Sequence, residues 1–352
     1  MVYMKINEWI PGLFPIPFFQ TWCCDRSSVT PAQTGTSACS EVFHELSNAG
    51  LPPKMYDCVR SNLLLNRVGE DCIHYLFCDA DCREFIKNEY PPDVLMAYDR
   101  LIPTAFKADL WRYCVLYKYG GVYLDVKWGF SPPITGRRRL HPDTSSVDCN
   151  LRSIITAFWG VSSLGSGDGG GGGGGGGDDC LLVLERDSVG LWPSGRFGIH
   201  NAFIITNPKN PLLLDCIFSI VSSAKSKTGG IDRNWLNTSL SGWMTRPLFV
   251  TGPGLLGDIW RKHFFRRYEN NNTTYDTVPD SYATMASYFR FFFEGNGRIG
   301  YFTGGDGGGE YVTLLEVYDG YQEEYNHMIR HSNCIPHYTV LWSNGNVWNR
   351  IE

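Results

Sequence analysis

The amino-acid sequence predicts an α/β protein in which helices cover a parallel or mixed β-sheet. Two observations carry this prediction. Strand-like apolar runs alternate with helical segments along the first half of the chain, which is the order that builds such sheets. The chain is also long enough for a sizeable core: of its 352 residues, 43% are hydrophobic and 19% are charged, as in ordinary globular proteins.

The first half begins with two strand–helix pairs. Residues 18–22 (FFQTW) and 73–79 (IHYLFCD) are rich in aromatic and branched side chains and predict strands. Residues 40–49 and 81–90 predict helices. The second helix stops before a Pro-Pro pair, because proline cannot continue a helix.

A helix, a glycine break and a short strand follow. Residues 107–119 repeat apolar side chains at helical spacing, and a Gly-Gly pair ends the helix because glycine readily adopts the backbone conformation of a helix end. Residues 122–126 (VYLDV) predict the strand. Since side chains alternate between the two faces of a strand, Asp125 and Lys127 are expected to point the same way.

A glycine-rich tract at residues 162–180 divides the chain. Glycine loses so much backbone entropy on ordering that a flexible surface loop is expected there. After the tract, residues 201–208 predict a strand, and residues 211–224 predict a helix with proline in its first turn. The remaining C-terminal part predicts mainly loops.

Composition and charge limit the partners and the compartment. The formal net charge is −5 and the isoelectric point is about 5.9, which leaves no electrostatic footprint for nucleic acid. No run reaches the ~18 apolar residues of a membrane span, so none is expected in this chain. The 12 cysteines lack zinc-site spacing and predict reduced, mainly buried thiols of a cytosol-like compartment. N-x-[ST] triplets at Asn237, Asn271 and Asn272 leave a secretory location open.

Charged residues of the central helix and strand are the candidate functional groups. Asp109 lies three residues before Arg112, so the two either form an ion pair on a surface helix or Asp109 faces a ligand together with Lys107. Asp125 falls at the carboxyl end of its strand, where open α/β sheets bind ligands. Asp125 and Lys127 are therefore either a structural ion pair or two groups that serve a polar substrate.

Residues 106–128 (FKADLWRYCVLYKYGGVYLDVKW) resemble the central motif of the D-x-D glycosyltransferases, the family that includes fungal initiating α-mannosyltransferases and related bacterial and giant-virus sugar transferases. Other segments resemble further blocks of this family in the same order: IPFFQTW at 16–22, FCDADCREFIKNEYPPDVLMAYDRL at 77–101, FGIHNAFIITNPKNPLL at 197–213, VTGPGLLG at 250–257 and HYTVLW at 337–342. A dinucleotide oxidoreductase is disfavoured, since no G-x-G-x-x-G joins a strand to a helix.

The resemblance implies a GT-A fold: a Rossmann-like mixed sheet flanked by helices, with a loop-rich acceptor side. Residues 1–161 would form the nucleotide-sugar-binding half, and residues 181–352 the acceptor-side and C-terminal half of the same domain. The implied activity is a hexosyltransferase that moves a sugar from a nucleotide-sugar to an acceptor hydroxyl with retention. The acceptor would be a glycan, a lipid-linked molecule or a protein. The expected location is the cytoplasm, which would be the cytoplasm of the host if the protein is viral. The alternative is the Golgi or secretory lumen, with a membrane anchor missing from this sequence.

The resemblance also assigns roles to single positions. In chain order these are Gln20, Thr21 and Trp22 beside the base or ribose, Lys107 and Asp109 on the ribose or sugar, Asp125 as the first carboxylate of the motif, Asn201 in the sugar pocket and His337 as a further metal or diphosphate contact.

The motif departs from the family pattern at its last position. Family members place a second carboxylate there and bind Mn²⁺ or Mg²⁺ through oxygen ligands, whereas this chain has Lys127. Either the Lys127 ammonium takes over the cation's electrostatic task at the diphosphate, which makes Asp125 and Lys127 the candidate catalytic pair, or a metal is held by Asp125 and His337. The departure also leaves open a non-catalytic protein that binds nucleotides or glycans. A second Asp-x-Asp, at residues 79–81, precedes a predicted helix and is expected to cap it.

Overall fold

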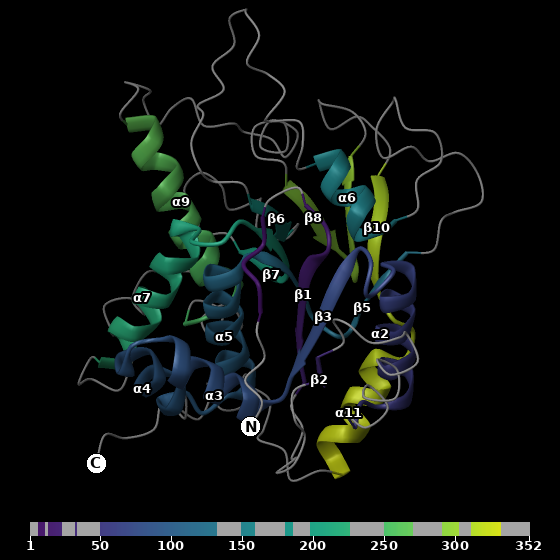
Figure 1. Cartoon of the computed structure of the whole chain (residues 1–352), viewed down its shortest axis with the longest axis horizontal. Helices are drawn as coiled ribbons and strands as arrows, with labels where there is room; N and C mark the ends of the chain where they lie inside the picture. Colours follow the sequence, from purple (N-terminus) through teal and green to yellow (C-terminus); the bar gives the residue numbers. More distant parts are fainter. Residues whose placement is uncertain are drawn as a thin grey trace, which may run out of the picture.

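A computed structural model of the chain describes residues 6–10, 13–22, 32–33, 50–131, 149–158, 180–185, 198–225, 250–269, 291–302 and 311–331. Within these residues, ten strands form one mixed sheet in the order β2-β3-β1-β4-β7-β6-β8-β9-β10-β5. Helices lie on both faces of the sheet (Figure 1). The α/β class predicted from the sequence is therefore confirmed.

One end of the sheet comes mainly from the N-terminal half: β2 (Ala32–Gln33), β3 (Cys72–Phe77), β1 (Ile16–Thr21), β4 (Gly121–Leu124) and then β7 (Ile199–Thr206). β1 lies between β3 and β4 and runs parallel to both. The three strands consequently end at the same edge of the sheet. β7 is antiparallel to β4, so it begins near that edge.

The other end of the sheet is built from β6 (Cys180–Glu185), β8 (Phe291–Gly295), β9 (Arg298–Phe302), β10 (Tyr311–Val317) and β5 (Trp128–Phe130). β5 is outermost and pairs with β10, although only residues 125–127 separate it from β4 along the chain. The far end of the sheet therefore returns to the place where β4 ends. This return brings C-terminal elements next to the central motif.

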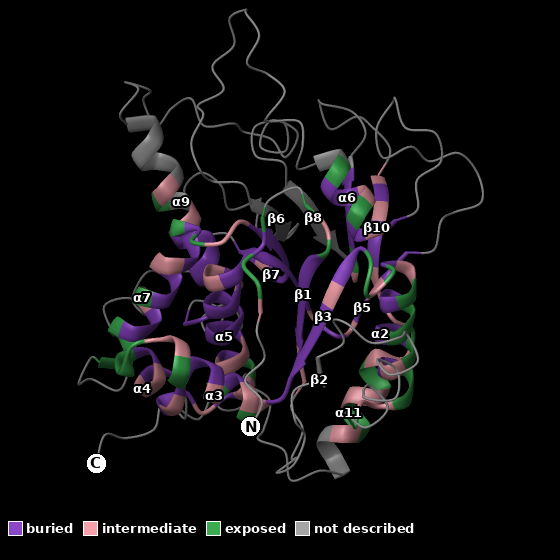
Figure 2. Cartoon of the chain, in the orientation of Figure 1, coloured by how far each residue is buried: buried purple, intermediate pink, exposed green. Residues whose placement is uncertain are grey.

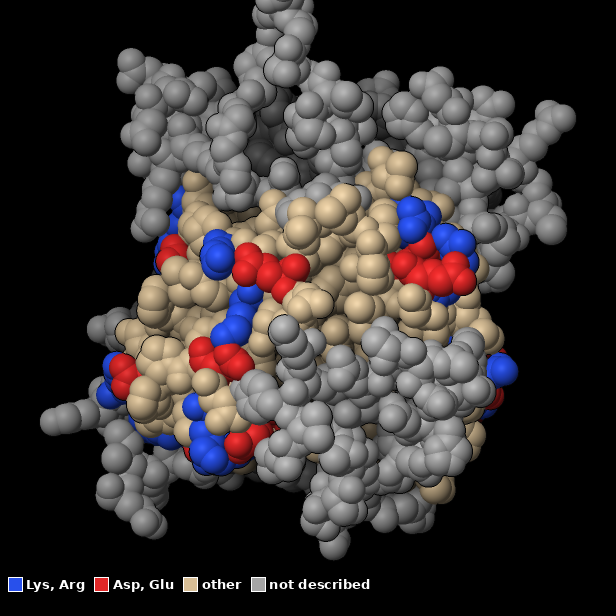
Figure 3. All heavy atoms as spheres, in the orientation of Figure 1, with Lys and Arg blue, Asp and Glu red and all other residues tan. Residues whose placement is uncertain are grey.

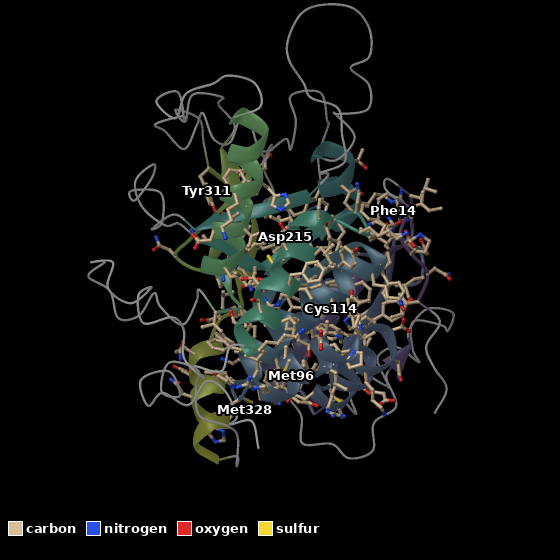
Figure 4. The ribbon with its side chains drawn as sticks, turned by 90° about the vertical axis from the view of Figure 1, so that its left-hand side faces the viewer. Phe14, Met96, Cys114, Asp215, Tyr311 and Met328 are labelled. Atoms are coloured by element: carbon tan, nitrogen blue, oxygen red, sulfur yellow. The ribbon has the colours of Figure 1, made fainter. Side chains whose placement is uncertain are left out.

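Five helices cover one face of the sheet: α3 (Asp79–Glu89), α4 (Pro92–Arg100), α5 (Thr104–Tyr119), α7 (Pro211–Lys225) and α9 (Pro253–Glu269). Figure 4 shows Cys114 of α5 in the middle of this layer. α5 is buried almost all round, with Leu110, Trp111 and Cys114 fully inaccessible to solvent. Because α5 packs between the sheet and α7, it needs apolar side chains on more than the one face that helical spacing indicates.

The opposite face carries α2 (Pro53–Leu65), α6 (Leu151–Phe158) and α11 (Tyr321–His331). The strands between the two helical layers are largely buried, while exposed residues follow the outer sides of α2 and α11 (Figure 2). The sheet thus separates two apolar cores, one under each layer.

The predicted elements can be compared with the observed ones. The strands at 18–22, 73–79 and 201–208 and the helices at 81–90, 107–119 and 211–224 correspond to β1, β3, β7, α3, α5 and α7. The helix at 40–49 lies outside the described residues, as does the glycine tract apart from Cys180. The expectation of mainly loops near the C-terminus is wrong for the described part, where β8, β9 and β10 are five to seven residues long and too short to give a clear periodic signal.

Two further findings concern the compartment. Among the described residues, no helix combines the length and the apolar character that crossing a membrane requires. The cysteine side chains that the structure describes are all buried, as the prediction of mainly buried thiols requires; they are Cys58, Cys72, Cys78, Cys82, Cys114, Cys149 and Cys216.

Candidate active site

Asp125 and Lys127 lie in a turn and not on a strand. β4 ends at Leu124, and the Trp128 N–H donates to the Asp125 carbonyl at 3.1 Å, which closes the turn. The strand predicted at 122–126 is therefore too long, and strand alternation does not set the direction of the two side chains. The turn nonetheless brings them together. Lys127 Nζ lies 4.0 Å from Asp125 Oδ2, and the side chains are 29% and 25% exposed.

Three other elements hold this turn. The Asp125 N–H donates to the Ala202 carbonyl of β7 at 2.8 Å, and the N–H of Tyr318, just after β10, donates to the Lys127 carbonyl at 3.1 Å. Asn62 of α2 holds β5, because its Nδ2 donates to the Trp128 carbonyl at 2.7 Å and its Oδ1 accepts from the Phe130 N–H at 2.9 Å. A buried side chain thus takes the place of a neighbouring strand at the outer edge of β5.

The Asp125 carboxylate is fixed by two neighbours from the other face of the sheet. Its Oδ1 accepts a hydrogen bond from the Tyr123 hydroxyl at 2.6 Å and lies 3.4 Å from Nη2 of Arg112. Burial acts to raise the pKa of Asp125, but Arg112, Lys127 and the Tyr123 hydroxyl together hold it below its usual value. Asp125 is therefore ionised at neutral pH.

Arg112 of α5 links the two acidic residues of the central motif. Its Nη2 lies 3.2 Å from Asp109 Oδ1 as well as 3.4 Å from Asp125 Oδ1, and its Nη1 donates to the Asn201 carbonyl at 2.7 Å. Its guanidinium carbon lies 4.3 Å from the centre of the Tyr123 ring, an arrangement that stabilises a cation. Burial acts to lower the pKa of Arg112. Tyr123, Asp125 and Asp109 have the larger, opposite effect and hold this pKa above its usual value, so the guanidinium keeps its charge.

Asp109 and Asn201 meet in the same network. Asn201 Nδ2 donates to Asp109 Oδ1 at 2.9 Å, and the Thr251 hydroxyl donates to Asp109 Oδ2 at 2.8 Å. Burial raises the pKa of Asp109, against the opposing effect of Arg112 and these two donors. The predicted ion pair of Asp109 and Arg112 is therefore present, but its expected position on a surface helix is wrong, because both residues are buried. The donor contacts predicted for Asp109 and Asn201 stay predictions.

Gln20 is inaccessible to solvent and joins three strands. Its Nε2 donates to the Leu124 carbonyl of β4 at 3.1 Å, and its Oε1 bonds with His74 Nε2 of β3 at 3.0 Å. Gln20 therefore supports the residue that directly precedes Asp125. Whether it also lies near a bound base or ribose stays a prediction.

The other residues that the resemblance assigned lie further along the same edge or outside the described part. Thr21 ends β1, and its hydroxyl donates to the Phe77 carbonyl at 3.0 Å; Trp22 follows it and is half-buried. Lys107, in the first turn of α5, places its ammonium 5.3 Å from the centre of the Tyr98 ring. Their donor roles stay predictions. His337 lies outside the described residues.

The sequence analysis gave no role to three neighbours of the site. Tyr123 and Thr251 belong to the segments that resemble the family, but no local pattern pairs them with Asp125 and Asp109. His200 of β7 packs edge-on against Trp128, with ring centres 5.5 Å apart. Burial, reinforced by Lys127, lowers the pKa of His200 to about 3, so this ring is neutral at physiological pH.

The residues around Asp125 do not suit a divalent cation. Mn²⁺ and Mg²⁺ take several oxygen ligands, but the groups beside this carboxylate are the Arg112 guanidinium and the Lys127 ammonium, which repel a cation. In the part of the chain that the structure describes, no group of three or more His, Cys, Asp or Glu residues could hold a metal ion. The other Asp-x-Asp lies in the first turn of α3 and not before it. Cys78 is the N-cap residue, and Asp81 meets the expected capping role from within the helix by accepting from the Cys78 N–H at 3.0 Å.

Part of the chain is similar to known proteins. Residues 47–145 match the family described as glycosyltransferase sugar-binding region containing DXD motif. Similar curated proteins are inositol phosphoceramide mannosyltransferase 3 of Schizosaccharomyces pombe (34% identity over 27% of this chain and 26% of the relative), an uncharacterized glycosyltransferase of Acanthamoeba polyphaga mimivirus (45% over 14% and 20%) and the initiation-specific alpha-1,6-mannosyltransferase of Candida albicans (40% over 16% and 15%).

The chain thus matches about a quarter or less of the length of these relatives. Its mixed sheet with helices on both faces is consistent with a GT-A-like fold. Residues 47–145 are therefore similar to the sugar-binding region of the D-x-D glycosyltransferases, in agreement with the resemblance that the sequence analysis describes.

Proposed function

We propose that this protein is a glycosyltransferase that moves a sugar from a nucleotide-sugar donor to an acceptor hydroxyl with retention of configuration. One observation supports this proposal above all. An ionised carboxylate and an ammonium group, on Asp125 and Lys127, are held 4.0 Å apart in a braced turn at the carboxyl edge of the sheet. Such an edge is where α/β sheets bind nucleotides.

Lys127 has the charge that the reaction needs. When the bond between the sugar C1 and the diphosphate breaks, negative charge develops on the leaving diphosphate, and a fixed cation stabilises that charge. Lys127 is partly exposed and can face the diphosphate directly. Asp125, kept ionised by Arg112, holds the ammonium in place and can accept hydrogen bonds from donor hydroxyls.

Retention follows from a front-face route. The acceptor oxygen forms its bond to C1 on the side from which the diphosphate leaves, and the hydroxyl proton passes to the departing phosphate oxygen. This route requires no carboxylate nucleophile. It suits a turn whose one carboxylate is already engaged by Tyr123 and Arg112.

The relatives suggest where to look for the substrate. Two of them are named as mannosyltransferases, so a mannosyl donor is the first to test, with glycan, lipid-linked and protein acceptors. The buried cysteine side chains suit a reducing compartment such as the cytoplasm. The Golgi or secretory lumen is the alternative.

A second candidate function is a non-catalytic protein that binds nucleotides or glycans. The replacement of the second carboxylate by Lys127 favours it, since a cation-dependent enzyme would lose its metal ligand there. The two candidates differ in turnover and share binding.

A panel of UDP- and GDP-sugars distinguishes them. The full chain is incubated with each donor, once in EDTA and once with Mn²⁺, and release of nucleoside diphosphate is measured with and without acceptors. We expect one donor to turn over without added metal, and Lys127→Ala to lower the rate about 10²-fold or more. Lys87→Ala, at an exposed position of α3, is the control. Binding without turnover for every donor would establish the non-catalytic protein, and undiminished transfer by Lys127→Ala would end the role given to Lys127.

A further inference from the structure

The ammonium group of Lys127 lies close to two aromatic rings. Its Nζ is 6.0 Å from the centre of the Trp128 ring and 5.6 Å from the centre of the Tyr321 ring. Trp128 is the next residue along the chain, but Tyr321 begins α11 and is remote in sequence. Cations near aromatic faces are attracted by the negative face of the ring. The position of Lys127 thus depends on an element outside the central motif.

The Tyr321 ring is itself held in place. It stacks on Tyr325, with ring centres 5.6 Å apart and an interplanar angle of 28°, and it meets Tyr318 edge-on at 5.6 Å. Tyr325 lies one turn further along α11, and Tyr318 lies just before the helix. Because the Tyr321 ring packs on two other rings, it can adopt few orientations, and its contact with Lys127 is well defined.

α11 is fastened to the rest of the protein through Glu324. The Glu324 carboxylate accepts hydrogen bonds from the N–H groups of Lys54 at 2.9 Å and Met55 at 3.2 Å, which lie in the first turn of α2. α2 has Pro52 at its N-cap position and no side-chain cap of its own, so Glu324 supplies acceptors for N–H groups that would otherwise lack them. Figure 1 shows α11 beside α2.

The backbone completes the connection. Glu324 also accepts from the Tyr318 hydroxyl at 2.7 Å, and the Tyr318 N–H donates to the Lys127 carbonyl at 3.1 Å. Backbone and side chain of Lys127 are therefore both bound by the same short segment, residues 318–325. This segment follows β10, which pairs with β5 directly after the turn.

We propose that Tyr321 is a positioning residue, which holds the Lys127 ammonium toward the diphosphate of the donor. This inference rests on the proposed function and deepens it. A lysine side chain is flexible, and the beginning of α11 provides the contact that fixes its ammonium. Asp125, itself held by Arg112, pairs with the Lys127 ammonium, and the Tyr321 ring lies against the same ammonium. Without the ring, the flexible lysine side chain would sample other rotamers and bind diphosphate less well.

Calorimetry tests this role by measuring how tightly UDP, GDP and ADP bind to the full chain in EDTA. For the nucleotide that binds, we expect Tyr321→Leu to weaken the affinity about 5-fold, the loss of one exposed cation–aromatic contact, and Tyr321→Phe to retain it. Tyr311→Leu, the same change at the end of β10 that does not pair with β5, is the matched control and should stay within about twofold. In a Lys127→Met background, Tyr321→Leu should have no further effect.

A chemical measurement tests the contact without any ligand. N-acetoxysuccinimide acetylates lysine amines, and mass spectrometry gives the rate at Lys127 relative to Lys87, which is exposed on α3. We expect Tyr321→Leu to accelerate labelling of Lys127 at least about twofold, and Tyr321→Phe to leave it unchanged.

The outcomes separate the two proposals. Unchanged labelling and unchanged affinity in Tyr321→Leu would overturn the positioning role while leaving the proposed function intact. Equal weakening by Tyr321→Leu with and without Lys127 would also overturn it, because the ring would then act on the fold in general. Accelerated labelling in a protein that binds no nucleotide would refute the proposed function, and with it any role of Tyr321 at a diphosphate.

Discussion

At the scale of single side chains, Arg112 connects the two acidic residues of the central motif. Its guanidinium is buried between Asp109 and Asp125 and carries a positive charge that both carboxylates need. A buried ion pair adds little net stability compared with apolar packing, but removing one partner leaves an uncompensated charge. Arg112 therefore matters for stability as well as for the direction of Asp125.

We expect Arg112→Met to destabilise the protein by about 3 kcal/mol at pH 8, because the buried carboxylate of Asp109 loses its cation and the half-buried Asp125 keeps only Lys127. Urea denaturation measures the change. Arg83→Met is the matched control: Arg83 forms a pair with Asp99 at 2.7 Å, but the two side chains are 47% and 38% exposed, so the loss should stay below about 1 kcal/mol. Similar losses for the two variants would contradict the view that burial makes Arg112 different.

The sequence indicated part of this arrangement. It placed Asp125 and Lys127 side by side, and they are neighbours, although a turn and not a strand brings them together. It could not choose between an exposed and a buried Asp109–Arg112 pair, because the same spacing occurs in both. That choice depends on Asn201 and Thr251, which reach the helix from distant segments.

At the scale of secondary-structure elements, the junction between α5 and β4 depends on a glycine that allows the strands β1 and β4 to approach closely. Gly121 has φ +95°, and a Cβ atom there would lie 2.4 Å from the Pro17 carbonyl oxygen of β1. A side chain would therefore push β1 and β4 apart. The direction of β4, and with it the position of Asp125, follows from this contact.

Gly69 offers a matched comparison, since its φ is +92° but a Cβ atom there would meet nothing within 4 Å. We expect Gly69→Ala to cost about 1–2 kcal/mol through backbone strain alone. Gly121→Ala should cost a further ~2 kcal/mol or more, because overpacking adds to the same strain. Denaturation midpoints of the two variants give the difference. Equal costs would show that β1 and β4 can separate without penalty.

At the scale of the whole molecule, stability should depend on pH through a buried histidine. On the face drawn in Figure 3, acidic and basic side chains lie in small neighbouring groups, without one large patch of either sign. Inside the sheet, His74 is 1% exposed, and burial lowers its pKa from 6.5 to about 3. The folded protein therefore keeps His74 neutral where the unfolded chain takes up a proton.

The sign of the effect follows from this difference. Between pH 6.5 and 3 the unfolded state binds more protons, so the free energy of unfolding falls as the pH falls through that window. We expect His74 to contribute a loss on the order of 1–2 kcal/mol between pH 7.5 and pH 5, and His74→Gln to remove this contribution. His327→Gln, at an exposed position of α11, is the control for the exchange of a histidine for glutamine. An identical pH dependence in His74→Gln and the unaltered protein would contradict the prediction.

The sequence by itself determined the α/β class, most element positions and the relation to D-x-D glycosyltransferases, because these depend on residues close together in the chain. Helical spacing, strand composition, glycine breaks and the motif at 106–128 all act over a few residues. Only the tertiary structure decided which side chains surround Asp125 and Lys127. Arg112, Asn201 and Thr251 meet on one side of the turn and Tyr321 lies on the other, since the sheet returns at β5 and brings distant segments to one edge. Such contacts depend on how the layers pack, which no local pattern encodes.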